Sequence, residues 1–317
     1  MSKKSLGPSP VMTAPRYAGI ASFMRTPILS APDEADIAMI GVPFDGGVTN
    51  RSGARHGPRE LRNQSTLMRV IHQSTRINPY ELCRIGDLGD VDLPQLYDLE
   101  DNVERIFRFY EAVRDAGTIP LTAGGDHCIT YPILKALGAA APLSVVHIDA
   151  HTDTWDSFGG SKYMHGTPFR RAVEEGLIDP KRTIQVGIRG GQNATDGWDY
   201  SIASGMRVIF MDEADELGVA GILAQIKNVI GENPTYLSFD IDALDPAHAP
   251  GTGTPESGGF TSREAIALVR GLRGVDLIGA DLVEVSPPLD PGTNTALVGA
   301  TLMFEMLCLL AESVAAR

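Results

Sequence analysis

Eight short apolar runs, separated by longer amphipathic segments, constrain the fold of this chain more than any other feature of its sequence. The apolar runs, which we predict to be strands, cover residues 37–42, 82–87, 119–124, 143–148, 183–188, 207–211, 235–240 and 276–281. The segments with helical periodicity cover residues 59–70, 99–116, 130–137, 169–176, 218–229, 262–270 and 295–311. This alternation predicts a parallel sheet flanked by helices, either closed into a barrel or open and doubly wound. In both architectures, functional groups are expected just beyond the carboxyl ends of the strands.

The bulk properties indicate one globular domain that acts on a small molecule. The chain has 317 residues and no linker-like stretch, so we expect a single domain over residues 1–317, with a poorly ordered arm at about residues 1–15. A formal net charge of −13 argues against nucleic acid and anionic membranes as partners and favours a neutral or cationic substrate. The apolar segment 293–313 is interrupted by Glu305, which indicates a packed helix and not a membrane span. Because the first residues lack an apolar secretory core, we expect a cytoplasmic protein.

Polar clusters follow several of the predicted strands directly. They are GDH at residues 125–127, DAHTD at 149–153, DID at 240–242 and LVEVSPP at 282–288. In an extended chain alternate side chains point to the same side. The candidate set therefore combines four carboxylates with two imidazoles, and its members are His127, Asp149, His151, Asp153, Asp240 and Asp242.

Four aspartates in a partly dry crevice repel one another and lose their hydration, so cations are required beside them. Two divalent ions would cancel the four charges. Carboxylates and imidazoles without thiolates suit Mn²⁺, with Ni²⁺, Co²⁺ and Zn²⁺ as alternatives. A pair of ions about 3.5–4 Å apart lowers the pKa of a bridging water, which predicts hydrolytic chemistry.

Each of these residues, taken alone, also has a simpler structural explanation. A single aspartate after a strand is usually a helix cap or loop residue, but three polar clusters at strand ends are hard to explain in that way. His147 has the same alternation as Asp149 but lies deeper in its strand, so we interpret it as a core histidine. Gly124 and Gly125 lack the lysine or the glycine spacing of a phosphate-binding loop.

The motifs GGDH (124–127), DAHTD (149–153), HGTPF (165–169) and SFDIDALDPAHAPGTGTPESGG (238–259) together resemble those of the ureohydrolase family, which includes arginase, agmatinase, guanidinobutyrase and guanidinopropionase. The similarity extends from GVPFDGG (41–47) to LVEVSPP (282–288). It implies the arginase-type three-layer fold, with an open, eight-stranded, mostly parallel sheet flanked by helices. It also implies a binuclear manganese hydrolase that assembles into trimers or hexamers.

The resemblance also implies a role for individual residues. His127, Asp149, Asp153 and Asp240 would surround one ion, whereas Asp149, His151, Asp240 and Asp242 would hold the other. His165 corresponds to a histidine that relays protons near the substrate. Glu284 corresponds to the carboxylate that receives a guanidinium group, and Asp153 would also steady the reacting species.

The charges favour a cationic substrate, because four aspartates, two dications, a hydroxide and Glu284 sum to minus two. A guanidino compound cleaved to urea and an amine fits, and the overall sequence most resembles guanidinopropionase and guanidinobutyrase. The expected substrate is therefore 3-guanidinopropionate or 4-guanidinobutyrate, read in part by Tyr163 in the loop 157–166. Two departures from these relatives, Trp155 and His248, lie at candidate substrate positions and favour a short or N-alkylated guanidine.

The sequence is compatible with other substrates and with two other kinds of function. The substrate could be agmatine, free guanidine or a biguanide such as metformin. A noncatalytic subunit of the same family would be expected to lose ligands, and all six are present. A deacetylase on a related fold would need one zinc ion and fewer carboxylates.

Overall fold

The computed structural model describes residues 7, 8, 15–95 and 97–317, so most of the arm expected at residues 1–15 lies outside the described residues. Eight strands form one sheet. They are β1 (Ile37–Gly41), β2 (Ile85–Asp90), β3 (Ile119–Ala123), β4 (Leu143–Ile148), β5 (Ile178–Ile188), β6 (Arg207–Phe210), β7 (Thr235–Asp240) and β8 (Leu277–Val283).

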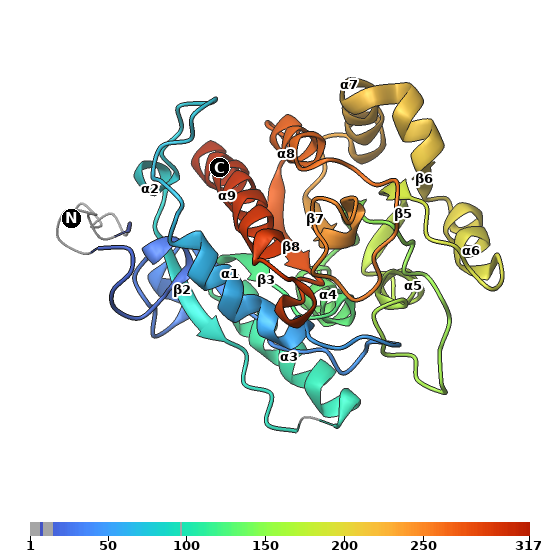
Figure 1. Ribbon diagram of the computed structural model, residues 1–317, viewed down its shortest axis with the longest axis horizontal. Helices are drawn as coiled ribbons and strands as arrows, with labels where there is room; N and C mark the ends of the chain where they lie inside the picture. Colours follow the sequence, from blue (N-terminus) through green and yellow to red (C-terminus); the bar gives the residue numbers. More distant parts are fainter. Residues whose placement is uncertain (1–6, 9–14, 96) are drawn as a thin grey trace.

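The sheet is open, with the strand order β2-β1-β3-β8-β7-β4-β5-β6, and every neighbouring pair is parallel. The predicted open, parallel sheet is confirmed, and the barrel alternative is wrong because β2 and β6 remain separate edges. Figure 1 shows the strands in the middle of the molecule with helices on both sides.

The α-helices are α1 (Gly57–Ser65), α2 (Pro79–Leu82), α3 (Leu99–Asp115), α4 (Thr130–Leu137), α5 (Pro168–Glu174), α6 (Asp196–Ser204), α7 (Met211–Ile230), α8 (Ser262–Gly271) and α9 (Asn294–Ala316). The 3-10 turns are η1 (Phe23–Arg25), η2 (Pro32–Glu34), η3 (Ala54–His56), η4 (His127–Ile129), η5 (Ile241–Ala243) and η6 (Pro287–Leu289). Three layers result, since helices cover both faces of the sheet (Figure 1).

Side-chain alternation along the strands divides the core into two apolar clusters. In β1, Ile37 and Met39 join the cluster that includes α7, α8 and α9, whereas Ala38 and Ile40 join the cluster that includes α3, α4 and α5. Strands buried on both faces are typical of parallel sheets. A binding site is therefore expected at the carboxyl ends of the strands and in the loops beyond them.

The long apolar helix α9 lies against α1, α8 and β8 in the core. Among the described residues it is the helix with the length and apolar composition that a membrane span would need, but 72% of its most apolar window is buried within the protein. Its Glu305 is buried and contacts His72 at 2.9 Å, and it also pairs with Arg270. The prediction of a packed helix at 293–313 is confirmed.

Some strands begin at other residues than the periodicity predicted. The strand expected at 82–87 begins only at Ile85, because Pro79–Leu82 forms the short helix α2 and Asn78 caps it by accepting a hydrogen bond from the Tyr80 N–H. The strand expected at 183–188 begins earlier, at Ile178. Helix α6 was not predicted from the sequence.

Gly125 shows why the GGDH motif needs a glycine before its acidic residue. Its N–H donates to the Val42 carbonyl at 2.9 Å, and a Cβ added at Gly125 would overlap the carbonyl oxygen of Phe44. The β1 loop and the β3 loop therefore pack backbone against backbone at this point. This close approach explains the glycine without a phosphate ligand.

We expect Gly125→Ala to lower the free energy of unfolding by about 2–3 kcal/mol, because the rigid backbone of Phe44 leaves no room for a methyl group. Urea unfolding followed by circular dichroism measures the change. Gly292→Ala is the matched control, since no atom lies within 4 Å of a Cβ added there. Equal stability of the two variants would contradict this interpretation.

Candidate metal centre

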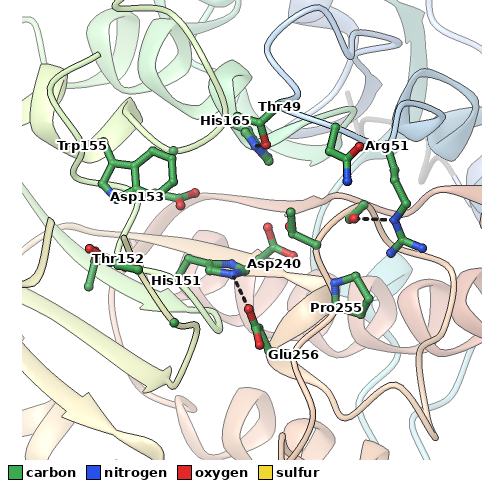
Figure 2. Close-up of a pocket in the computed structure, with 16 residues that line it drawn as sticks. Thr49, Arg51, His151, Thr152, Asp153, Trp155, His165, Asp240, Pro255 and Glu256 are labelled. Atoms are coloured by element: carbon green, nitrogen blue, oxygen red, sulfur yellow. Dashed lines mark hydrogen bonds and ion pairs between the residues drawn. The ribbon is translucent and has the colours of Figure 1, made fainter. Parts of the chain in front are cut away.

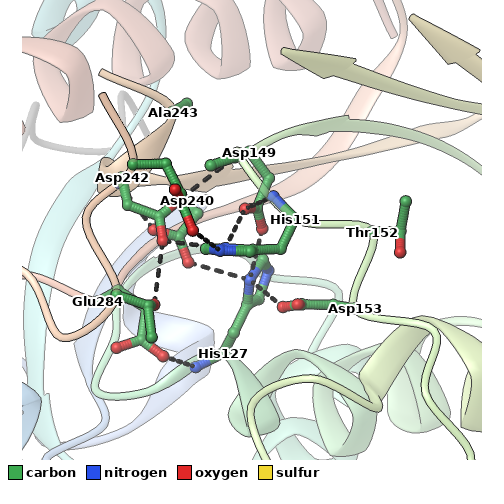
Figure 3. A network of polar contacts seen from close by, with 12 residues as sticks. His127, Asp149, His151, Thr152, Asp153, Asp240, Asp242, Ala243 and Glu284 are labelled. Atoms are coloured by element: carbon green, nitrogen blue, oxygen red, sulfur yellow. Dashed lines mark hydrogen bonds and ion pairs between the residues drawn. The ribbon is translucent and has the colours of Figure 1, made fainter. Parts of the chain in front are cut away.

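The polar clusters meet because four of the strands that precede them are adjacent in the sheet. Strands β3, β8, β7 and β4 lie side by side in that order, and all four point in the same direction. The carboxyl ends of parallel strands form one edge of the sheet, where ligands usually bind. Figure 3 shows the side chains that follow these strands converging on one point.

The imidazole of His127 faces three carboxylates. Its Nδ1 lies 3.1 Å from Asp149 Oδ2, 2.9 Å from Asp153 Oδ2 and 3.2 Å from Asp240 Oδ2 (Figure 3). This nitrogen is buried, yet it has no hydrogen-bond partner among the described residues. A buried nitrogen without a partner, surrounded by carboxylate oxygens, fits a metal ligand.

The other ring nitrogen of His127 is held by a hydrogen-bond chain that fixes its protonation. His127 Nε2 lies 2.9 Å from Ser238 Oγ, and this hydroxyl donates to Asp281 Oδ1 at 2.7 Å. Tyr236 and Thr130 also donate their hydroxyls to Asp281, at 2.8 and 2.7 Å. Since Ser238 gives its single proton to Asp281, it must accept from His127 Nε2. The proton therefore lies on Nε2, and Nδ1 keeps the lone pair that a metal needs.

A second group of ligand atoms surrounds His151. Its Nδ1 lies 3.2 Å from Asp242 Oδ2 and 3.4 Å from Asp149 Oδ1, and its Nε2 lies 3.6 Å from Glu256 Oε1. Asp149 thus contributes one oxygen to each histidine. Asp242 Oδ1 accepts from the Ala150 N–H at 3.2 Å, which connects the β7 and β4 loops.

Electrostatics makes this group of carboxylates unfavourable without a cation. Burial, together with the negative charges of Asp242 and Asp149, raises the pKa of Asp240 well above its usual range. Burial also raises the pKa of Asp242. A bound dication reverses this preference because it stabilises the ionised carboxylates. The donor set and its charge therefore fit divalent metal ions.

His147 supports the cluster from within the sheet. The Gln185 amide donates one hydrogen to the Thr152 carbonyl at 2.6 Å and the other to His147 Nδ1 at 3.0 Å. The remaining ring proton is therefore on Nε2, which donates to Asp149 Oδ2 at 2.7 Å. The structure places His147 in the core, as we expected, in a position to orient Asp149.

Glu284 and His165 form a pair beside the cluster. Glu284 Oε1 accepts from the His127 N–H at 3.0 Å and lies 3.1 Å from His165 Nδ1, while its Oε2 is buried without a partner among the described residues. The other nitrogen of His165 lies 3.0 Å from Thr49 Oγ1. Burial alone would lower the pKa of His165, but the hydrogen bond and charge of Glu284 prevail and raise it to about 9. Both Glu284 and Asp153 have a positive φ, at 64° and 51°.

Asp126 is a site residue that the sequence reasoning missed. It is fully buried and accepts from the Gly47 N–H at 2.7 Å and from the Cys128 N–H at 2.9 Å, so it caps η4 and fixes His127. Burial, followed by the charge of Glu284, raises the pKa of Asp126 to about 8. Its position in GGDH, directly before the predicted metal ligand His127, could have identified it as a site residue.

A cavity of about 350 Å³ opens above the cluster (Figure 2). It is lined by residues from the loops after β1, β4, β5 and β7, namely Thr49, Asn50, Arg51, His151, Thr152, Asp153, Trp155, His165, Gly166, Gly191, Gln192, Asp240, Gly253, Thr254, Pro255 and Glu256. Glu256 and Arg51 were not predicted, because their positions depend on how long loops fold.

Of the three substrate residues predicted from the sequence, only Trp155 lines this cavity. Its ring also stacks on Phe158 at 6.3 Å between centroids. Tyr163 lies outside the cavity and stacks on Tyr131 at 5.8 Å. His248 is also outside it, with its ring 3.5 Å from the Ser262 hydroxyl. The structure does not bring Tyr163 or His248 to the site.

Comparisons with known proteins agree with this geometry. A family model described as "Arginase family" matches residues 35–308. The chain is 59% identical to guanidinopropionase from Pseudomonas aeruginosa over 311 residues, covering 97% of this chain and 98% of that protein. It is 48% identical to human mitochondrial guanidino acid hydrolase, covering 96% of this chain and 86% of that protein.

Among solved structures, proclavaminate amidinohydrolase from Streptomyces clavuligerus superposes with a TM-score of 0.91 at 40% identity, covering 95% of this chain and 100% of that one. The fold is therefore the arginase fold that the motifs implied. The sheet order, the family match and these relatives lead to one conclusion: the chain belongs to the arginase family, whose members are also called ureohydrolases.

Proposed function

We propose that this protein hydrolyses a guanidino acid, 3-guanidinopropionate or 4-guanidinobutyrate, to urea and an ω-amino acid. The observation that carries the proposal is Glu284 Oε2, a buried carboxylate oxygen without a partner beside the cluster of ligand atoms. A guanidinium group offers planar N–H donors and a positive charge to such an oxygen. Similarity to a guanidinopropionase and a guanidino acid hydrolase supports the same substrate class.

We infer that six side chains hold two divalent ions, and these are His127, Asp149, His151, Asp153, Asp240 and Asp242. Asp149 and Asp240 would contact both ions. Oxygen-rich donor sets with imidazole favour Mn²⁺, with Ni²⁺ or Co²⁺ as alternatives. When bound, such a pair supplies a nucleophilic water of lowered pKa and neutralises the carboxylates.

The side chains around the ions position the substrate and move its protons. Glu284 would hold the guanidinium through Oε2 while its Oε1 stays bonded to the His127 N–H. His165 lines the cavity and is oriented by hydrogen bonds with Glu284 and Thr49. In this position it would donate a proton to the departing amine. Asp153 lies at the junction of the cluster and the cavity, where it would steady the reacting carbon centre.

A second candidate function has one specific observation in its favour. Trp155 lines the cavity, where a bulky aromatic side chain would limit the space for a substrate tail and could offer an aromatic face to a cation. This arrangement favours a small or N-alkylated guanidine, including free guanidine or metformin. Agmatine is a further alternative, because Glu256 lines the same cavity and its carboxylate could pair with the cationic tail.

We also propose that the protein works as a homo-oligomer, a trimer or hexamer, in the cytoplasm. Exposed apolar side chains gather near the amino terminus, where Tyr17 is 92% exposed, Ile20 85% and Ile28 60%, and association would cover them. The three cysteines are free, which suits a reducing compartment.

The first test of this function is urea release from guanidino acids, agmatine, arginine, guanidine and metformin, with Mn²⁺ and with Ni²⁺. We expect the highest kcat/KM for a guanidino acid. In Glu284→Gln we expect kcat/KM to fall by about 10²- to 10³-fold, because a neutral amide replaces the charge that receives the guanidinium. Metal content per chain should stay at the wild-type value. Urea release by Glu284→Gln at the wild-type rate would contradict the proposal.

A second test addresses the ligand assignment without measuring activity. We expect Ser238→Ala to weaken binding of the ion at His127 by about 10- to 100-fold, because the hydrogen-bond chain no longer fixes the proton on Nε2. Isothermal titration of the metal-free protein with Mn²⁺ measures the affinity.

Ser144→Ala is the matched control for this test. Ser144 is a fully buried serine of the neighbouring strand β4, and its hydroxyl has no partner among the described residues. If both variants bind Mn²⁺ as tightly as the wild type, the hydrogen-bond chain does not prepare His127 for a metal.

A further inference from the structure

Arg51 stands out in a cavity whose other ionisable groups are carboxylates and imidazoles. Among the described residues that line the cavity, it is the one side chain with a permanent positive charge. Figure 2 shows it on the side of the cavity opposite Trp155, with His151 and Asp240 between them. A cation in this place is unexpected if the whole substrate is positively charged.

The loop that carries Arg51 is anchored at both ends by one buried carboxylate. Asp45 Oδ2 accepts from the Gly53 N–H at 2.7 Å and from the Arg55 N–H at 3.3 Å, and the Arg55 side chain pairs with the same carboxylate. Asp45 is 3% exposed. The loop between these anchors is therefore fixed, and Arg51 projects from a defined backbone.

The guanidinium of Arg51 is also fixed, but only part of it is used. Its Nε donates to the Gly253 carbonyl at 2.8 Å (Figure 2). Its Nη2 donates to the Thr252 carbonyl at 2.9 Å. A guanidinium has five N–H donors, so these two bonds leave Nη1 and one hydrogen of Nη2 for another acceptor. Because the group is held in place, binding an anion there costs little ordering.

The same short segment, 252–253, lies between Arg51 and Glu284. A Cβ added at Gly253 would be 3.7 Å from Glu284 Oε2, and the Gly253 carbonyl accepts a hydrogen bond from Arg51 Nε at 2.8 Å. The two charged side chains are therefore separated by little more than one residue of backbone. A substrate that places its guanidinium on Glu284 and carries an anion on a short tail would bring that anion toward Arg51.

We propose that Arg51 binds the tail carboxylate of the substrate and so selects guanidino acids over guanidines with neutral or cationic tails. This inference rests on the proposed guanidino-acid hydrolase function. It assigns a specificity-determining residue, whereas the metal ligands, Glu284 and His165 serve any guanidine. A purely structural clamp on residues 252–253 would affect all substrates equally, so the two roles can be separated.

The experiment compares 3-guanidinopropionate with N-propylguanidine, which has a tail of the same length without the carboxylate. In Arg51→Gln we expect kcat/KM for 3-guanidinopropionate to fall by about 10- to 100-fold, mainly through KM, because a hydrogen-bonded charge pair is lost. For N-propylguanidine we expect a change of less than about 3-fold, since the lost group does not touch a neutral tail.

Further variants keep the test decisive if Arg51→Gln folds poorly. Arg51→Lys retains the charge and should keep part of the preference for the acid, although a lysine lacks the bidentate geometry. Arg51→Glu should shift the preference toward agmatine, whose tail is cationic. Arg108→Gln is the matched surface control, because Arg108 lies on the exposed face of α3, where it pairs with Glu104 and Glu111.

The outcomes distinguish this inference from the function on which it rests. If the wild type releases urea from 3-guanidinopropionate and Arg51→Gln slows both substrates by the same factor, Arg51 is a structural clamp and the inference is wrong. If Arg51→Gln changes neither substrate, it is also wrong. If the wild type hydrolyses N-propylguanidine but no guanidino acid, the proposed substrate class itself fails, and the inference falls with it.

Discussion

Repulsion among buried carboxylates at four adjacent strand ends is the constraint on which the site depends. Asp149, Asp153 and Asp240 all lie within 3.2 Å of one imidazole nitrogen, in a place from which water is largely excluded. A bound dication would stabilise the ionised form of these carboxylates. The strand order brings these residues together, and the backbone contacts at Gly125 and the Asp126 cap hold His127 among them.

Around this cluster, hydrogen bonds from neighbouring side chains set the orientation and protonation of the candidate metal ligands. Directed hydrogen bonds put the ring protons of His127 and His147 on Nε2. One arrangement leaves a lone pair free on His127, and the other orients Asp149. Glu284 Oε1 accepts a hydrogen bond from the His127 N–H, whereas Oε2 has no partner among the described residues. The site is therefore prepared before a ligand enters, as efficient catalysis requires.

Much of this could be predicted from the sequence, because strand periodicity is local. The alternation of Asp149, His151 and Asp153 predicted a common side, but β4 ends at Ile148 and Asp153 has a positive φ of 51°, so bends beyond the strand bring these side chains together. The family motifs predicted the open sheet. The strand order could not be read from periodicity alone, since it depends on packing between distant segments. The positions of loop side chains were the hardest to predict: Tyr163 stacks on Tyr131 outside the cavity, whereas Arg51 and Glu256 line it.

Anomalous diffraction from crystals grown with Mn²⁺ would show whether two dications share this cluster, as we propose. We expect two anomalous peaks in each chain. One peak should lie among His127, Asp149, Asp153 and Asp240, and the other among Asp149, His151, Asp240 and Asp242. A single peak, or none at saturating Mn²⁺, would show that the cluster does not hold two ions.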